Sequence, residues 1–267
     1  MKFLFGKQVR NMPPSGNGKR LLFILGAYPS ALHVRWHHPG LVTSIRAVAI
    51  DNEPEPFWTG KGEQELIEEW KRAVGFQDKW GSVFPCGGSN GPSGLWVEKK
   101  ILVPLGLPRS KAWITDCLDT YFESKAAADR LNAPELVNLI KQYGIPDRQH
   151  RHHPSESDIV SEAKQHHLER LRNELTIASP ELIVTLGNAA LRVMNILIDG
   201  YSDKISKLSA KEEYGRKFQV QVCGQNAEWL PLAHPAAPKI YQDAHDIWCK
   251  SFNTRVQEVD RNIGKEG

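Results

Sequence analysis

Short apolar runs rich in Val, Ile and Leu alternate along this 267-residue chain with longer stretches that have the spacing of amphipathic helices. Parallel strands are buried on both faces and are joined by crossovers that are usually helical, so this alternation predicts a mostly parallel central sheet with helices on both faces. We therefore expect an α/β fold, a three-layer α/β/α sandwich. The expected strands are 20–26, 45–50, 112–116, 181–186, 218–223 and 229–233, and the expected helices are 63–74, 134–143, 156–177, 189–198 and 242–259.

The loop residues predict a single domain. Gly- and Pro-rich loops at 12–18 and 85–94 are short, and neither resembles a linker between domains. The chain is 40% apolar, which is enough to fill one substantial core. We expect an N-terminal extension over 1–19, one domain over 20–260 and a C-terminal tail over 261–267.

Charge, hydropathy and cysteine usage exclude several classes of protein. The 34 Lys and Arg residues against 31 Asp and Glu leave a formal charge of +3, so any nucleic-acid binding must come from a local patch. The longest apolar run, 21–25, is far shorter than the roughly 20 residues that span a bilayer. It predicts no membrane segment, and the absence of a secretory apolar stretch at the start predicts a cytoplasmic protein. Four cysteines without a CxxC pair predict reduced thiols rather than disulfides, zinc or an iron–sulfur cluster.

Several histidines lie close together in the sequence and are candidate metal ligands. His33 and His37 would lie one turn apart if their segment were helical. No pattern of cysteines or carboxylates accompanies them, and contact between a basic loop and phosphate is the better interpretation. We expect no metal and no cofactor.

Three segments follow expected strands and would meet at one edge of the sheet. They are Leu25-Gly26-Ala27-Tyr28-Pro29-Ser30, then Leu186-Gly187-Asn188-Ala189, and finally Leu232-Ala233-His234-Pro235-Ala236. In open α/β sheets, ligands bind beyond the carboxyl ends of the strands, so these turns could face one crevice.

In this order the three segments resemble the uracil-DNA glycosylase superfamily, whose members carry an early G-x-x-P-x motif and a late H-P-S/A motif. The run Pro-x-Leu-Ile-Val-x-Leu-Gly-Asn-x-Ala over 180–190 is similar to the family-4-like branch, and the similarity spans 20–241. The resemblance implies a DNA glycosylase fold and base flipping, with the N-glycosidic bond broken through an oxocarbenium-like sugar. His234 would then donate a hydrogen bond to the departing base.

The catalytic carboxylate of the superfamily is missing from the first motif. Tyr28 stands where the best-known branch has Asp, and Ala27 stands where the family-4 branch has Glu. Tyrosine, with an ordinary pKa of about 10, cannot replace a carboxylate near neutral pH. Asp51 is our first candidate for water activation or stabilisation of the sugar cation, and Glu53 is the second; a solvated acidic loop is the competing interpretation.

Several positions are expected to contact the base. Phe57 or Trp58 would stack on it, although both could equally be core residues. Ser30 replaces a tyrosine that, in the family, blocks groups on base carbon 5, so the pocket should admit a 5-substituted pyrimidine. Asp116 matches the family's edge-reading Asn, and an ionised Asp would accept a hydrogen bond from the exocyclic amine of cytosine. The full expected set is Gly26, Ala27, Tyr28, Ser30, Phe57, Trp58, Asp116 and Asn188.

DNA contacts are expected on either side of this pocket. Lys239 with Ile240 or Tyr241 follows the His-Pro motif, where the family inserts an apolar wedge into the duplex. Arg35, His37 and Arg151 would bind flanking phosphates.

The resulting hypothesis is a monomeric, monofunctional DNA glycosylase acting on duplex DNA. Its expected substrate is a 5-modified cytosine, such as the hydroxymethyl or glucosylated base of phage DNA, and its expected role is antiphage defence. The alternatives are an ordinary uracil-DNA glycosylase of base-excision repair and a catalytically inactive protein that binds DNA or modified bases.

Overall fold

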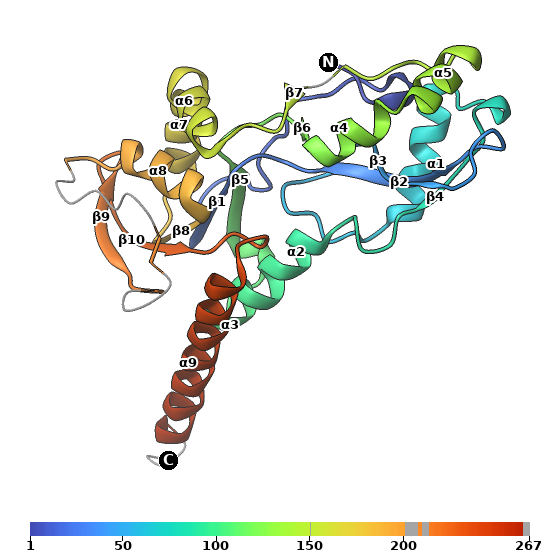
Figure 1. Cartoon of the computed structure of the whole chain (residues 1–267). Coiled ribbons are helices and arrows are strands. Elements are labelled where there is room, and N and C mark those ends of the chain that lie inside the picture. The colour runs from blue at the N-terminus through green and yellow to red at the C-terminus, as the bar shows by residue number, and fades with distance from the viewer. Residues whose placement is uncertain (150, 201–207, 210–213, 264–267) are drawn as a thin grey trace. The chain divides into compact units, whose positions relative to one another are not determined.

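The computed structural model describes residues 1–149, 151–200, 208–209 and 214–263, with side chains in the last helix described as far as Ser251 (Figure 1). These residues form two compact units. Unit 1 comprises Met1–Pro13, Tyr28–Gly94 and Asp119–Ser155, and unit 2 comprises Pro14–Ala27, Leu95–Leu118 and Glu156–Gly267. His150 and residues 264–267 of the expected tail lie outside the described residues.

Unit 2 is built on a five-stranded sheet in the order β5-β1-β8-β10-β9. The first four strands are parallel, and β9 pairs with β10 antiparallel through the two-residue turn Cys223-Gly224. Both turn residues have positive φ, 52° and 73°, as a tight hairpin turn requires. The strands are β1 (Leu22–Gly26), β5 (Ala112–Asp116), β8 (Leu182–Leu186), β9 (Phe218–Val222) and β10 (Gln225–Leu232).

Helices flank this sheet. The expected helix over 156–177 is confirmed as two α-helices joined by a π-helical turn, and α8 packs on β8, β1 and β10 (Figure 1). The helical elements are α2 (Pro92–Val97), a π-helical turn (Glu98–Leu102), α3 (Val103–Leu105), a 3-10 turn (Arg109–Lys111), α6 (Glu156–Glu162), a π-helical turn (Ala163–His167), α7 (Leu168–Ala178), α8 (Gly187–Leu197) and α9 (Lys239–Ile263).

Unit 1 holds a three-stranded antiparallel sheet in the order β3-β2-β4 over an aromatic core. Phe5 lies at the centre of this core, and its ring contacts those of Trp36, Trp70, Phe76 and Trp80. The elements are a 3-10 turn (Leu4–Gly6), β2 (Ala31–His37), β3 (Ile45–Asn52), α1 (Glu63–Val74), a 3-10 turn (Asp78–Trp80), β4 (Ser82–Pro85), β6 (Phe122–Glu123), α4 (Lys125–Leu131), α5 (Pro134–Gln142) and β7 (Arg151–His152).

The structure confirms a mixed α/β fold with a mostly parallel sheet flanked by helices. The expected domain boundaries stay a prediction, although Phe3, Leu4 and Phe5 of the expected extension are buried within unit 1. The segment that carries His33 and His37 is the strand β2, so the condition under which the two histidines would lie one helical turn apart is not met. Four residues of strand span about 13 Å, so the two rings cannot share a metal ion. Among the described residues, no helix has the length and apolar character needed to cross a membrane.

Candidate functional site

The strand order of unit 2 creates a crevice where the sequence motifs end. From β1 the chain goes to β5 on one side, and then crosses to β8 and β10 on the other. The connections diverge between β1 and β8, and ligands of open α/β sheets bind at such a switch point, beyond the carboxyl ends of the strands. Gly26 ends β1, Gly187 follows β8 and Ala233 follows β10. The sheet therefore brings the ends of all three motif strands to one edge of unit 2.

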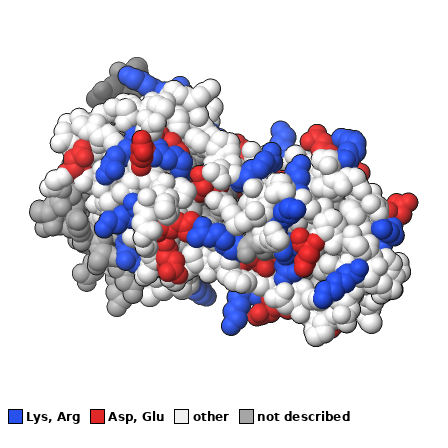
Figure 2. Space-filling view, turned by 90° about the horizontal axis from the view of Figure 1, so that it is seen from above, with Lys and Arg blue, Asp and Glu red and all other residues white. Residues whose placement is uncertain are grey.

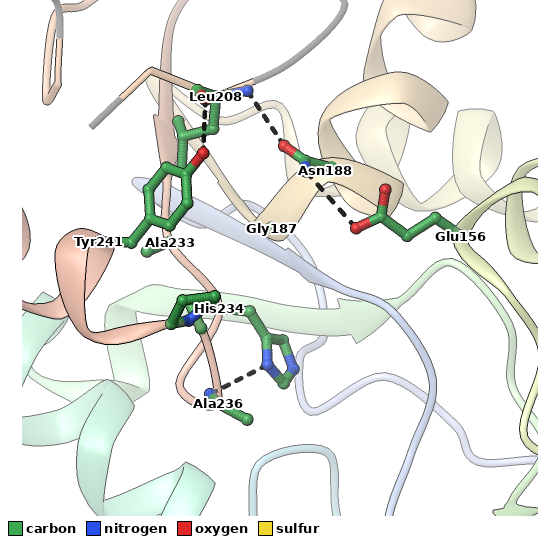
Figure 3. Close-up of a pocket in the computed structure, with 10 residues that line it drawn as sticks. Glu156, Gly187, Asn188, Leu208, Ala233, His234, Ala236 and Tyr241 are labelled. Atoms are coloured by element: carbon green, nitrogen blue, oxygen red, sulfur yellow. Dashed lines mark hydrogen bonds between the residues drawn. The ribbon is translucent and has the colours of Figure 1, made fainter. Parts of the chain in front are cut away.

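A pocket of about 240 Å³ opens at this edge (Figure 3). The turn after β8 contributes Gly187 and Asn188 to its wall, and the turn after β10 contributes His234. Glu156 from the start of α6 and Tyr241 from the first turn of α9 complete the polar part of the lining. Two of the expected functional residues, His234 and Asn188, thus lie in one pocket.

The geometry around His234 fixes which of its ring nitrogens carries the proton. The backbone N–H of Ala236 donates to His234 Nδ1 at 3.1 Å, so Nδ1 is the acceptor (Figure 3). Burial lowers the pKa of this histidine below its ordinary value, which favours the neutral ring near pH 7. A neutral imidazole whose Nδ1 accepts carries its proton on Nε2. His234 is therefore a neutral hydrogen-bond donor.

The turn that carries His234 is held from two sides. The backbone of Gly187 has φ +86°, which strains any other residue, and a Cβ there would lie 3.1 Å from His234 Cβ and crowd the histidine. Gln242 Nε2 donates to the carbonyl of Pro235 at 2.8 Å, which ties the turn to α9. These contacts fix the turn backbone that directs the imidazole.

A buried hydrogen-bond chain anchors the residue before His234. The N–H of Ala233 donates to the Tyr214 hydroxyl at 2.9 Å, and that hydroxyl donates to His245 Nδ1 at 2.7 Å. His245 Nε2 donates to the carbonyl of Lys100 at 3.0 Å. Burial lowers the pKa of His245 to about 4, so the ring stays neutral and accepts the tyrosine proton.

The opposite wall of the pocket is a chain of weaker hydrogen bonds. Asn188 Oδ1 accepts from the N–H of Leu208 at 3.0 Å, and its Nδ2 donates to Glu156 Oε1 at 3.5 Å. The Tyr241 hydroxyl donates to the carbonyl of Leu208 at 3.2 Å. Glu156 places a carboxylate in the same pocket as His234, and sequence reasoning missed it. Its place at the first residue of the expected helix over 156–177 was the available signal.

Asp116 ends β5, directly beside the end of β1, and its register partner there is Gly26. Only 5% of the residue is exposed. Burial raises the pKa of its carboxyl group to about 7, with Glu174 raising it further and Arg170 opposing the shift. With this pKa, the neutral and the ionised carboxyl group are both populated near neutral pH, and the ionised form expected from the sequence stays a prediction.

The first motif continues from unit 2 into unit 1. In unit 2, the carbonyls of Gly26 and Ala27 accept from the N–H groups of Cys117 and Leu118, each at 3.0 Å. These bonds join the turn after β1 to the chain that leaves β5. Gly26 is buried and Ala27 is half-buried.

In unit 1, Tyr28 lies beside two other rings, those of Phe122 and His153. Its ring makes edge contacts with Phe122 and His153 at centroid distances of 5.2 and 5.5 Å. The guanidinium of Arg151 stacks over the same Phe122 ring, 4.9 Å from its centroid. Ser30 follows on the surface and is exposed. Tyr28 of the motif and Arg151, which was expected to bind phosphate, therefore contact the same Phe122 ring.

The two carboxylates proposed from the sequence also belong to unit 1. Asp51 lies in β3, where Lys7 Nζ is 3.6 Å from its Oδ2 and Arg10 Nη2 is 3.4 Å from its Oδ1. Its Oδ1 also accepts from the N–H of Asn52. Glu53 follows β3 and is buried. Asp51 thus has a structural role in pairing the N-terminal segment with β3.

Phe57 and Trp58 differ in their surroundings. Trp58 belongs to the buried core of unit 1, and its Nε1 donates to the carbonyl of Lys61. Phe57 has φ +51°, which is a strained conformation for a bulky residue. Gly94 packs against the carbonyls of both residues so closely that a Cβ there would lie 2.2 Å from each oxygen. The glycine-rich loop thus clamps the backbone that presents Phe57.

The expected DNA-binding residues are spread over both units. In unit 1, Arg35 lies 5.5 Å over the ring of Phe84, and His37 is exposed on the same strand. In unit 2, Lys239 is exposed and Ile240 is 56% exposed at the start of α9, whereas Tyr241 lines the pocket. On the face drawn in Figure 2, Lys and Arg are interspersed with Asp and Glu, as the small net charge suggests.

No protein-family model and no curated protein sequence matches the chain. Within the described parts of the chain, no group of three or more His, Cys, Asp or Glu residues is arranged to hold a metal ion.

Proposed function

We propose that this protein is a monofunctional DNA glycosylase that hydrolyses the N-glycosidic bond of a flipped pyrimidine and leaves an abasic site. The observation that carries the proposal is His234, a neutral Nε2–H donor in a pocket beyond the carboxyl ends of parallel strands. The resemblance of the strand-end motifs to the uracil-DNA glycosylase superfamily supports it independently. No motif places a lysine for Schiff-base chemistry, so we expect no lyase activity.

His234 would act on the leaving base. As the glycosidic bond breaks, negative charge develops on a carbonyl oxygen of the pyrimidine, and a preorganised N–H donor stabilises that charge. A neutral donor suits this role because it needs no proton from solvent and its orientation is already fixed by Ala236 and Gly187. Asn188, which lines the same pocket, is the second group proposed to contact the base.

The positive charge that develops on the sugar needs a carboxylate. Asp51 is the candidate from the sequence, with Glu53 as its substitute, but Lys7 and Arg10 already hold Asp51 in unit 1. Glu156 lines the pocket that contains His234. Its Oε1 accepts the hydrogen bond from Asn188, and that bond does not involve the other carboxylate oxygen, Oε2. We therefore propose Glu156 as a third candidate for orienting water or stabilising the sugar cation.

The proposed substrate is a pyrimidine enlarged at carbon 5. The small, exposed side chain of Ser30 supports this, because the family has a bulky tyrosine at that position. Phe57 and Trp58 are both proposed for stacking on the base; both are buried, and Trp58 also belongs to the aromatic core of unit 1. Hydroxymethylcytosine and its glucosylated form are the proposed bases, and antiphage defence is the proposed role.

DNA would be bound by the start of α9 in unit 2 and by cations of unit 1. Ile240 is the exposed apolar side chain next to the pocket, which favours it over Tyr241 as the wedge between base pairs. Lys239 would contact the adjacent phosphate, as would Arg151, Arg35 and His37.

An inactive DNA-binding protein is the second candidate, and one observation favours it: the first motif has no carboxylate, and Asp51 is ion-paired. An assay of base release distinguishes the DNA glycosylase from the inactive DNA-binding protein. Duplexes containing uracil, hydroxymethylcytosine or glucosylated hydroxymethylcytosine are incubated with the protein, and free base and alkali-labile abasic sites are measured. Release from the modified cytosines supports the proposal, release from uracil alone supports an ordinary uracil-DNA glycosylase, and tight binding without release supports the inactive protein.

The same assay identifies the carboxylate. Asp51→Asn and Glu156→Gln keep the size of each side chain and remove its negative charge. Loss of release in only one variant, with DNA binding retained, assigns the role to that residue. Loss in neither variant would exclude both and leave Glu53 to be tested.

A further inference from the structure

Asp116 has an unexplained oxygen at the edge of the sheet where the motifs meet. Its Oδ1 is buried and has no hydrogen-bond partner among the residues that the structure describes. Nearly all buried polar atoms in folded proteins have a partner, so this oxygen requires one beyond the described residues. Asp116 does not itself line the pocket that holds His234. The register partner of Asp116 is Gly26, the residue at which the first motif begins.

The charged groups around Asp116 come from α7. Arg170 Nη1 donates to Glu174 Oε1 at 2.7 Å and to Thr115 Oγ1 at 3.1 Å. Its Nη2 donates to the backbone carbonyls of Asp116 and Cys117 at 2.8 and 3.0 Å. The described hydrogen bonds of both terminal nitrogens of Arg170 therefore go to groups other than the Asp116 carboxyl.

Glu174 offsets the remaining positive charge. It accepts from Arg170 on one oxygen and from Trp113 Nε1 on the other, at 3.2 Å. A negative charge on Asp116 would therefore add a second buried carboxylate next to a single guanidinium. Burial is the first cause of the raised pKa of Asp116, and the repulsion from Glu174 adds to it.

We propose that Asp116 reads the edge of the flipped pyrimidine as a neutral carboxylic acid, through one O–H donor and one carbonyl acceptor. This inference rests on the proposed glycosylase function. It changes the chemistry assigned to the residue, because a neutral acid presents the same donor and acceptor pair as an asparagine amide.

A neutral acid fits the cytosine edge with two hydrogen bonds. Its O–H donates to ring nitrogen 3, and its carbonyl accepts from the exocyclic amine. With the proton on the other oxygen, the same group fits uracil, accepting from N3–H and donating to the 4-carbonyl. An ionised Asp116 would satisfy one atom of either base and place its second oxygen against an acceptor.

Two consequences follow for specificity. Asp116 alone would not separate cytosine from uracil, so that choice would rest on groups at carbon 5 of the base. Base release would also depend on the Asp116 proton, and would fall as the pH rises through the pKa of the carboxyl group. His234 adds no loss above pH 6.5, because burial lowers its pKa below that value.

The test compares the pH profile of base release for the wild type and Asp116→Asn between pH 6.5 and pH 9. With a pKa near 7 and an inactive ionised form, the wild-type rate should fall about 50-fold from pH 7 to pH 9. Asp116→Asn keeps a donor and an acceptor that do not titrate, so its rate should stay flat. Asp129→Asn, an exposed change on α4, is the control and should follow the wild type.

Parallel profiles for wild type and Asp116→Asn, or a wild-type rate that rises with pH, would overturn the inference. Infrared difference spectra of the DNA-free protein, wild type minus Asp116→Asn, measure the proton without any activity. A protonated carboxyl band at pH 6.5 that disappears by pH 9 supports the inference, and its absence at pH 6.5 overturns it. If no variant releases any base at any pH, the proposed function fails, whereas the infrared result still decides the state of Asp116.

Discussion

The roles of some residues in the site could be predicted from the sequence, and the roles of others could not. His234 was predictable because the strand end and Pro235 constrain where the side chain can lie. Asp51 was chosen for its place after a strand, but its contacts with Lys7 and Arg10 join segments about forty residues apart. Pairings over such distances leave no local pattern. The raised pKa of the Asp116 carboxyl group was equally hidden, since it depends on burial and on Glu174 in another element.

Ser30 provides a test of base size at the level of one side chain. Ser30→Tyr should block release of hydroxymethylated or glucosylated cytosine and spare uracil, because only the larger bases need the space that the ring would fill. Single-turnover release from the three duplexes measures the effect. Ser82→Tyr, an exposed change on β4, is the matched control and should leave all rates unchanged. Equal losses on uracil and on the modified bases would refute the steric argument.

At the level of elements, strands and helices with a simple pattern were predicted well. The expected strand over 112–116 and the expected helix over 63–74 coincide with β5 and α1. The strand was predictable because its residues form one short, continuously buried run, and the helix because its apolar residues have amphipathic spacing. β2 was missed, although its residues alternate between buried and more exposed positions as a half-covered strand does. His33 and His37 lie four residues apart in this strand, a spacing that also fits one turn of a helix, so the sequence pattern was ambiguous.

The turn after β8 offers a test of how one element positions another. Gly187→Ala strains a backbone with φ +86° and brings a Cβ within 3.1 Å of His234 Cβ. Gly224→Ala strains a similar backbone, φ +73°, with no neighbour within 4 Å. Both variants should lose roughly 1 kcal/mol of stability. Only Gly187→Ala should also slow base release, by about tenfold or more, because the imidazole is displaced.

Urea denaturation gives the free energy of unfolding for both variants, and single-turnover assays give their rates. Equal rates in the two glycine variants would show that Gly187 does not position His234.

For the whole molecule, the buried histidines predict a loss of stability in acid. The pKa of His245 is about 4 in the folded state, against an ordinary value of 6.5, and the residue is 0% exposed. The unfolded chain therefore binds more protons between these values, and stability is complete above pH 6.5 and falls as the pH drops toward 4. The shift corresponds to at most about 3 kcal/mol.

The urea midpoint measured from pH 7 to pH 4 tests this linkage. His245→Gln should be less stable at pH 7, because the Tyr214 hydroxyl loses its acceptor, yet its stability should fall less steeply with decreasing pH. An identical pH slope in the variant and the wild type would exclude His245 as the source.

The central claim is that His234 stabilises the departing base, and single-turnover base release tests it most directly. The wild type, His234→Ala and the control His166→Ala, an exposed histidine elsewhere in unit 2, are compared on duplexes with modified cytosine or uracil. We predict that the wild type and His166→Ala release free base and leave an abasic site. His234→Ala should bind the duplex as well but react about 10²–10³ times more slowly. No base release by the wild type, or an unchanged rate in His234→Ala, would contradict the account.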